Sequence, residues 1–343
     1  MKIAFITHED CISHKMDEDH LERPDRVRVI MEGVKESALK KDLDFFYAPL
    51  ATKAQLYSVH DKDYVDNLFN QSPKRGLVKI DDDTALNPHT IKAARRAAGA
   101  AIKAVDFVMN GKYKRVFCNV RPPGHHAERK KAMGFCFFNN VAIAAQYAMR
   151  AYGAKKVAIV DFDAHHGNGT EDIFQENEQV LFLSCFQKQL FPFWEGEDTD
   201  HILHAPLKVR TKGESLTKLF DDQWLPKLEA FKPDMIFISA GFDAHEDDPY
   251  SNLKFQPEDY EWMTQKLVQK AETLCSGRII SVLEGGYDLE ALRACALSHL
   301  KALTSYASLK QNEPYPVIFR KPVYNLRKSS KSDEKQSRKR LKP

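Results

Sequence analysis

Apolar and polar residues follow one another in blocks along most of the chain. Short apolar runs rich in β-branched residues are typical of strands buried on both faces of a parallel sheet; they cover residues 2–7, 115–120, 156–163, 179–185, 234–240 and 278–283. Segments with helical spacing of apolar residues lie between them, at residues 24–40, 88–110, 139–152, 213–231, 257–275 and 288–308. This alternation predicts an α/β fold with a central, mostly parallel sheet and helices on both faces.

The same pattern predicts one domain followed by a tail. No segment between residues 1 and 310 has the composition of a linker, so we expect a single domain over residues 1–312. Residues 320–343 hold ten Lys or Arg against two acidic residues, whereas the whole chain has a net charge of only +3. We therefore expect residues 313–343 to be a basic, disordered tail. It is the one segment that could contact nucleic acid or act as a nuclear or host-directed targeting signal.

The apolar runs and the cysteines indicate a cytoplasmic protein without a membrane span. No run of eighteen apolar residues occurs, and the apolar start of the chain is better explained as a first strand than as a signal peptide. The six cysteines are scattered without Cys-x-x-Cys spacing. We expect them to be reduced, buried thiols.

Polar residues gather just beyond four of the predicted strands. Asp161, Asp163 and His165 end the strand at 156–163, and side chains two apart on an extended chain point the same way. Three other strands end in the same manner, with His125-His126, with Asp243, and with Tyr287 behind a Gly-Gly pair. We expect these groups to meet at the carboxyl edge of the sheet, where open α/β folds place their ligands. Buried acids and histidines without partners are too costly to be structural alone.

Together these residue types predict metal-assisted hydrolysis of an amide-like carbonyl, although each motif alone is a weak signal. Asp163, His165 and Asp243 suit zinc, iron(II) or cobalt(II) and leave a coordination position for water. Such an ion turns water into a nucleophile near neutral pH. A neighbouring histidine pair can take a proton from that water and return one to a leaving group, and a phenol can donate to the developing oxyanion.

Six motifs in a fixed order carry a resemblance to a known family. They are HLERPDRV at 20–27, RPPGHHA, GFCFFNN, DFDAHHGNGT, SAGFDAHEDDP and EGGYDL. The sequence resembles the zinc-dependent deacetylases, which include histone deacetylases, acetylpolyamine amidohydrolases and acetoin-utilisation proteins, over about residues 5–305. The resemblance implies an arginase-like fold.

The resemblance also implies the roles of individual residues. One Zn²⁺ per chain, or Fe²⁺ in its place, would be bound by Asp163, His165 and Asp243. The implied catalytic residues are the acid/base pair His125 and His126, Asp161 and Asn168 behind them, and Tyr287 to polarise the acetyl carbonyl. A K⁺ ion is implied near Asp161, Asp163, His165 and Ser184.

Further residues are implied to contact the substrate. Phe135 and Phe191 would form the walls of a narrow channel, and the Gly134 carbonyl would accept a hydrogen bond from the scissile amide. Asp82 or Asp83 would bind the substrate backbone at the rim of that channel. Arg26 resembles an arginine that lines an inner cavity. The aromatic segment 187–203 is expected either to frame the entrance or to form a satellite hydrophobic cluster.

Two positions favour a class II-like enzyme that acts on acylated lysine. Asn168 stands where class I histone deacetylases usually have Asp; without that negative charge His126 should be less basic and start as a neutral base. Tyr250 stands where acetylpolyamine-selective members often have Glu. Protein or peptide acyl-lysine is therefore the expected substrate, with a small acetylated amine as the alternative.

Two other readings remain open at this point. A dinuclear, arginase-like site needs another Asp two residues after the metal ligand Asp243, and this chain has His245 there. A non-catalytic acyl-lysine binder is less expected, because every inferred catalytic position is filled. Acyl-chain preference and oligomeric state have no signal in the sequence.

Overall fold

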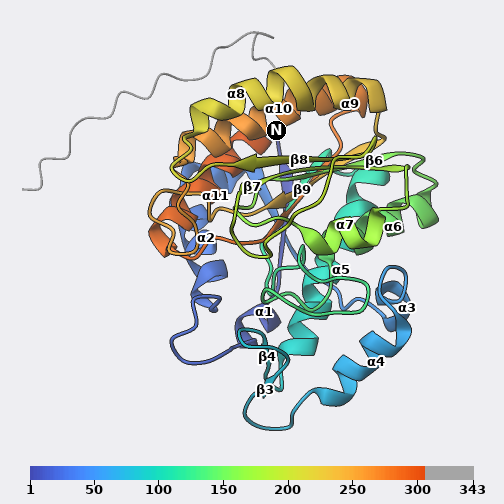
Figure 1. Cartoon of the computed structure of the whole chain (residues 1–343), viewed down its shortest axis with the longest axis vertical. Coiled ribbons are helices and arrows are strands. Elements are labelled where there is room, and N and C mark those ends of the chain that lie inside the picture. Colours follow the sequence, from blue (N-terminus) through green and yellow to red (C-terminus); the bar gives the residue numbers. More distant parts are fainter. Residues whose placement is uncertain (306–343) are drawn as a thin grey trace, which may run out of the picture.

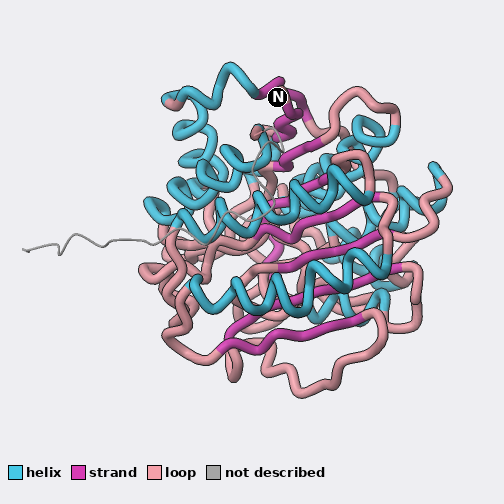
Figure 2. The backbone as a smooth tube through the Cα atoms, turned by 90° about the horizontal axis from the view of Figure 1, so that it is seen from above, coloured by secondary structure: helices cyan, strands magenta, loops and turns pink. Residues whose placement is uncertain are grey.

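A computed structural model describes residues 1–305, and its centre is an eight-stranded sheet. All neighbouring strands are parallel, and Figures 1 and 2 show them side by side. Their order is β2 (Leu43–Tyr47), β1 (Ile3–Thr7), β5 (Arg115–Cys118), β10 (Ile279–Leu283), β9 (Met235–Ala240), β6 (Val157–Asp161), β7 (Val180–Gln187) and β8 (Ile202–Leu207). The predicted parallel α/β sheet is confirmed. The predicted basic tail, residues 313–343, lies outside the described residues.

Helices cover both faces of the sheet because alternate side chains of each strand point to opposite sides. On one face, the α5 (Thr90–Met109) and α6 (Asn140–Tyr152) helices pack in one hydrophobic cluster. On the other face, which is uppermost in Figure 1, the cluster includes α2 (Asp25–Glu36), α10 (Pro257–Leu274) and α11 (Leu289–Thr304). In the strand β6, Val157 and Ile159 belong to the first cluster and Ala158 and Val160 to the second.

Shorter elements complete the described part of the chain. The helices are α1 (Asp10–Ser13), α3 (Lys53–Leu56), α4 (Lys62–Gln71), α7 (Asn168–Phe174), α8 (Leu216–Leu219) and α9 (Leu225–Phe231). A small antiparallel hairpin, β3 (Val78–Lys79) with β4 (Ala85–Leu86), lies near α4 at the bottom of Figure 1. Single 3₁₀ turns occupy Ala38–Asp42 and Gly213–Ser215.

Several observed elements were not predicted, among them the helices α1, α3, α4 and α7 and the β3–β4 hairpin. The edge strands β2 and β8 were not predicted, because each alternates between buried and open positions instead of forming a uniformly apolar run. The helix predicted at 213–231 is interrupted by a π-helical turn at Phe220–Trp224. Pro226 explains the break: it follows that turn, has no N–H to donate, and its ring crowds the carbonyl four residues back.

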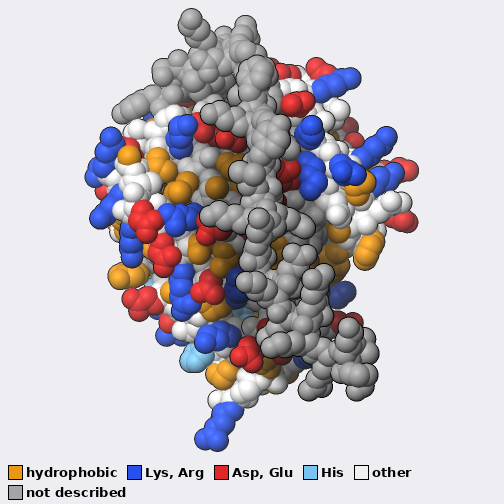
Figure 3. All heavy atoms as spheres, turned by 90° about the vertical axis from the view of Figure 1, so that its left-hand side faces the viewer, with side chains coloured by type: hydrophobic (Ala, Val, Ile, Leu, Met, Phe, Trp, Pro, Cys, Tyr) orange, Lys and Arg blue, Asp and Glu red, His pale blue; other side chains and the backbone are white. Residues whose placement is uncertain are grey.

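The surface and the cysteines agree with the predicted character of the domain. Among the described side chains visible in Figure 3, acidic and basic groups are interspersed. The six cysteines are buried and unpaired. Within residues 1–305 no helix has both the length and the apolar character that crossing a bilayer requires. The cytoplasmic location stays a prediction.

The sheet order places the predicted chemistry. The strands β5, β10, β9 and β6 are neighbours at the centre of the sheet, and they precede the polar residues singled out in the sequence. Their registers align Asp161 with Ser239 on β9 and with Ser184 on β7. Four consecutive strands therefore open their carboxyl ends onto one region.

Candidate active site and metal centre

Two carboxylates and an imidazole converge at the ends of β6 and β9. The His165 Nδ1 atom lies 3.1 Å from Asp163 Oδ1 and 2.9 Å from Asp243 Oδ2. Both acids are buried, and the His165 side chain is only 11% exposed. Backbone N–H groups hold the acids in place: Gly285 donates to Asp163 at 2.8 Å and Ala164 to Asp243 at 2.7 Å. These three side chains form a candidate metal-binding group.

The electrostatics of this group fit a divalent ion. Burial lowers the pKa of His165, but its hydrogen bonds to Asp163 and Asp243 outweigh burial and raise that pKa to about 10. The pKa of Asp243 is raised, first by burial and then by the charge of Asp163. Two buried acids therefore demand a positive charge between them, which a proton or a metal ion can supply. The donor set of two oxygens and one nitrogen is one that zinc accepts.

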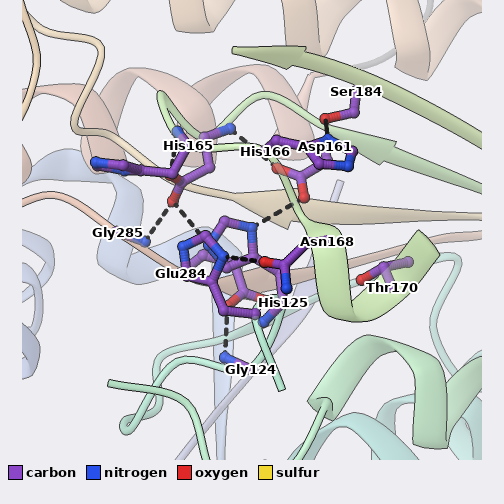
Figure 4. Close-up of polar contacts among 12 residues, drawn as sticks. Gly124, His125, Asp161, His165, His166, Asn168, Thr170, Ser184, Glu284 and Gly285 are labelled. Atoms are coloured by element: carbon purple, nitrogen blue, oxygen red, sulfur yellow. Dashed lines mark hydrogen bonds and ion pairs between the residues drawn. The ribbon is translucent and has the colours of Figure 1, made fainter. Parts of the chain in front are cut away.

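The histidine pair lies beside the metal centre, with its two rings 4.0 Å apart. His125 Nδ1 faces Asp161 Oδ2 at 3.0 Å, as Figure 4 shows, and His126 Nδ1 faces Asn168 Oδ1 at 2.8 Å. Burial opposes a charge on His125, yet Asp163 and Asp161 raise its pKa to about 10. The pKa of His126 lies well below its usual value, because of burial first and the positive charges of His125 and His165 second. The pKa values of the two imidazoles are therefore shifted in opposite directions, which favours His126 as the neutral base.

Glu128, which the sequence did not single out, fixes the tautomer of His126. The Asn168 side-chain amide donates to Glu128 Oε1 at 2.8 Å. Because a carboxylate only accepts, this bond turns the Asn168 carbonyl oxygen towards His126 Nδ1. That nitrogen must then carry the proton, and Nε2 is left as a free base. The low pKa of His126 agrees with the expectation drawn from Asn168, although burial is its first cause.

Tyr287 is held by a second acid that sequence reasoning missed. Its backbone N–H donates to Asp248 Oδ2 at 2.6 Å, and the other oxygen of Asp248 accepts from the Tyr250 N–H at 3.0 Å. Burial and the charge of Asp243 raise the pKa of Asp248 to about 7. The predicted inner arginine, Arg26, lies over the Tyr287 ring, 4.8 Å from its centroid. The DDP sequence after the metal loop was the available signal for Asp248.

Glu284 is a third acid without a role in the sequence prediction. It is fully buried, and its Oε2 atom accepts from the backbone N–H groups of Gly124 at 2.6 Å and His125 at 3.1 Å. Burial raises its pKa to about 7. Figure 4 shows how it joins the end of β10 to the loop that carries the histidine pair. An acid at the end of an apolar strand was the only sequence signal.

Aromatic rings surround the approach to these groups. Phe191 lies 5.1 Å from His126, Phe135 5.9 Å from Tyr287, and Tyr250 4.7 Å from Tyr287, measured between ring centroids. Gly134 has φ of +54°, and a Cβ atom there would lie 2.5 Å from His126 Cδ2. The backbone at this point can therefore reach the histidine only as glycine.

Asp83 and Ser184 lie at the edges of the predicted site. Asp83 is exposed on the β3–β4 hairpin, where its backbone carbonyl faces His20 Nε2 at 3.2 Å; its charge contributes to a raised pKa of Tyr250, after burial. Asp82 is exposed beside it. Ser184 is buried on β7 with its hydroxyl facing His166. The rim role and the potassium site stay predictions.

Comparison with known proteins gives consistent matches over most of the chain. Residues 20–303 match the model of the histone deacetylase domain. Type-2 histone deacetylase 2 of Dictyostelium discoideum is 39% identical over 88% of this chain, which spans only 21% of that protein. A probable deacetylase of Archaeoglobus fulgidus is 34% identical, with 92% of this chain and 90% of that protein covered. The crystal structure of the HDA15 HD domain matches with a TM-score of 0.82 at 34% identity, covering 88% of each chain.

Proposed function

Because the chain belongs to the histone deacetylase family, we propose that it is a zinc-dependent amidohydrolase that removes acetyl or other short acyl groups from lysine side chains of proteins or peptides. One observation supports the proposal: the candidate metal-binding group lies beside His126, whose ring centroid is 6.0 Å from that of His165, and the Phe191 and Phe135 rings lie 5.1 Å from His126 and 5.9 Å from Tyr287. This arrangement is what water attack on a buried amide requires.

The chain's own residues supply most of the chemistry. Zinc bound by Asp163, His165 and Asp243 would activate the water and polarise the carbonyl. The neutral His126 accepts the water proton at Nε2, since its Nδ1 already donates to Asn168. His125, whose Nδ1 is paired with Asp161, would stabilise negative charge as the tetrahedral intermediate forms. Tyr287 donates its phenol proton to the oxyanion as a hydrogen bond, and the leaving amine takes a proton from the histidine pair.

The surroundings of the site favour acyl-lysine over the alternatives. The rings of Phe135 and Tyr250, 5.9 Å apart, present apolar surface to a methylene chain. The Tyr250 position supplies no charge for a distal ammonium group. The dinuclear alternative finds no support in residues 1–305, because His245 turns its Nδ1 towards the Asp247 backbone and the candidate group at this centre has only three members.

The test is a substrate panel. Zinc-loaded protein is assayed with acetylated, longer-chain acylated and unmodified lysine peptides and with N-acetylated polyamines. We expect turnover of acyl-lysine peptides, inhibition by a hydroxamate, and loss of turnover in His126→Ala. Turnover of acetylpolyamines without turnover of acyl-lysine peptides would refute the substrate assignment. Absence of all amide hydrolysis would refute the assignment as an amidohydrolase.

A further inference from the structure

A second cluster of imidazole and carboxylate groups lies behind the catalytic centre. The Nε2 atoms of His166 and His204 lie 2.6 Å and 2.8 Å from the same oxygen, Glu171 Oε2. Candidate ligand atoms of the three residues all lie within 4.8 Å of one another. The two histidines are buried, whereas the Glu171 side chain is 23% exposed, so the cluster is reachable from solvent through Glu171.

The opposite nitrogen of each ring is already engaged. His166 Nδ1 lies 3.1 Å from Ser184 Oγ, and His204 Nδ1 lies 3.0 Å from Asp198 Oδ1. Because the Asp198 carboxylate only accepts, His204 donates from Nδ1. A singly protonated His204 then aims the lone pair of Nε2 at the Glu171 carboxylate, which is repulsive. Either a second proton or a metal ion must lie between the two atoms.

Two features of this cluster are those of a protein metal site: the hydrogen bond on the far nitrogen of a histidine, and close imidazole–carboxylate contacts. Metal-bound histidines commonly donate their remaining N–H to a carboxylate or another oxygen, as His204 does to Asp198. The contacts also resemble those of the catalytic centre, where one imidazole nitrogen lies 3.1 Å and 2.9 Å from two carboxylates. Two neutral imidazoles and one carboxylate suit zinc and related transition ions rather than calcium or magnesium.

We propose that His166, Glu171 and His204 bind a second divalent transition ion of the zinc class, with Ser184 and Asp198 orienting the two rings. The ion would be structural. Two ligands come from the continuous stretch formed by the loop after β6 and α7, and the third comes from β8, so the ion would join these two segments.

The ion would restrict most strongly the position of the aromatic segment between β7 and β8. Trp194 stacks on His204, with the ring centroids 3.7 Å apart and the planes 29° apart, and Asp198 belongs to the same segment. Phe191, which lies beside the catalytic His126, is three residues before Trp194. An ion at this site would therefore hold the wall of the substrate approach in place.

Zinc content per chain tests the proposal. Metal-stripped protein is reloaded with zinc, passed through a desalting column and analysed by elemental mass spectrometry. We expect two ions per chain in the wild type, one in Glu171→Gln, one in Asp243→Asn and none in the double variant. Glu176→Gln, an exposed glutamate on the same stretch of chain, is the matched control and should keep two. Equal zinc in Glu171→Gln and Glu176→Gln, or a single wild-type ion that only Asp243→Asn loses, would overturn the proposal.

Fluorescence gives a second readout in which the three proposed ligands stay unaltered. Co²⁺ bound at this site lies next to Trp194 and should quench its emission, whereas Trp224 and Trp262 belong to the hydrophobic cluster on one face of the sheet. To keep Co²⁺ out of the catalytic centre, the titration uses metal-stripped Asp243→Asn; we expect saturable quenching in this protein and its loss when Trp194→Phe is added. Quenching that is equal in both proteins would refute the site even if the Glu171 variant failed to fold. Neither readout depends on deacetylase activity.

Discussion

The orientation of Asn168 by Glu128 can be tested by introducing a negative charge at position 168, at the donor end of their hydrogen bond. Asn168→Asp places a carboxylate where the amide now donates to Glu128 at 2.8 Å. The two acids then repel each other, and the new side chain turns away from either Glu128 or His126. We expect lower stability, and a kcat/KM reduced by about tenfold to a hundredfold, because repulsion from Glu128 displaces the new carboxylate from His126 Nδ1, the contact that fixes the tautomer.

The structure sets the size of this effect. Two unit charges at about 2.8 Å repel by about 6 kcal/mol at an effective dielectric constant of about 20. Glu128 is partly exposed and can swing towards water. We therefore expect only about 1–2 kcal/mol of this repulsion to be measured as a lower free energy of unfolding.

A double-mutant cycle isolates the contact. In Glu128→Gln the repulsion is absent, and the glutamine amide can donate to the aspartate introduced at position 168. The double variant should recover stability and kcat/KM to within a few-fold of Glu128→Gln alone, which gives a coupling energy of about 1–2 kcal/mol. Urea unfolding and initial rates on an acetyl-lysine peptide supply both quantities. If Asn168→Asp lowers stability and kcat/KM equally in the wild-type and Glu128→Gln backgrounds, Glu128 does not orient Asn168 and the tautomer argument fails.

Three further changes have expected outcomes. Tyr287→Phe should lower kcat by about 10²–10³ with little change in the urea midpoint; a smaller loss would remove the phenol from the oxyanion site. Burial raises the pKa of Glu284 to about 7 in the folded chain, so stability should fall by about 3 kcal/mol as pH rises from about 4.5 to about 7. Glu284→Gln should flatten that part of the urea-derived stability profile, and an unchanged slope would contradict the assignment. Gly134→Ala should lower kcat/KM at least about tenfold by displacing His126, whereas Gly111→Ala, at φ of +69° with nothing within 4 Å of its Cβ, should lower stability only.

The fold could be predicted because its strands are buried on both faces and therefore uniformly apolar. The strands β6, β9 and β10 are fully buried along their whole length, which makes their sequences easy to recognise. Their parallel arrangement then brings the residues after them together, so the convergence of Asp163, His165 and Asp243 followed from chain order alone. The edge strand β2 was missed for the opposite reason, since one of its faces is open.

The groups that support the site could not be predicted, because their partners are distant in the sequence and are often backbone atoms. Glu284 accepts from the N–H groups of Gly124 and His125, about 160 residues away. Asp248 accepts from Tyr287, 39 residues away. The sequence signals, the DDP sequence for Asp248 and a strand end for Glu284, do not identify the backbone groups that each acid accepts from. Only the packing of the loops shows that each is buried and what it holds.

A buried network of charges, formed by Arg26, Glu22 and Arg121, also supports the site from positions distant in the sequence. Arg26 donates from Nε to the Gly286 carbonyl at 2.6 Å and lies over the Tyr287 ring, so it fixes the turn that carries the phenol. Glu22 balances this charge and accepts two hydrogen bonds from Arg121, at 2.7 Å and 2.6 Å. Burial would raise the pKa of Glu22, but Arg121 and its other partners hold it well below the usual value. An uncompensated arginine at this depth would be strongly destabilising. The position of the proposed oxyanion donor therefore depends on Glu22, which within residues 1–305 has no hydrogen bond to the candidate metal-binding group or to the histidine pair. Replacing Glu22 by glutamine should lower stability and kcat together, unlike Tyr287→Phe.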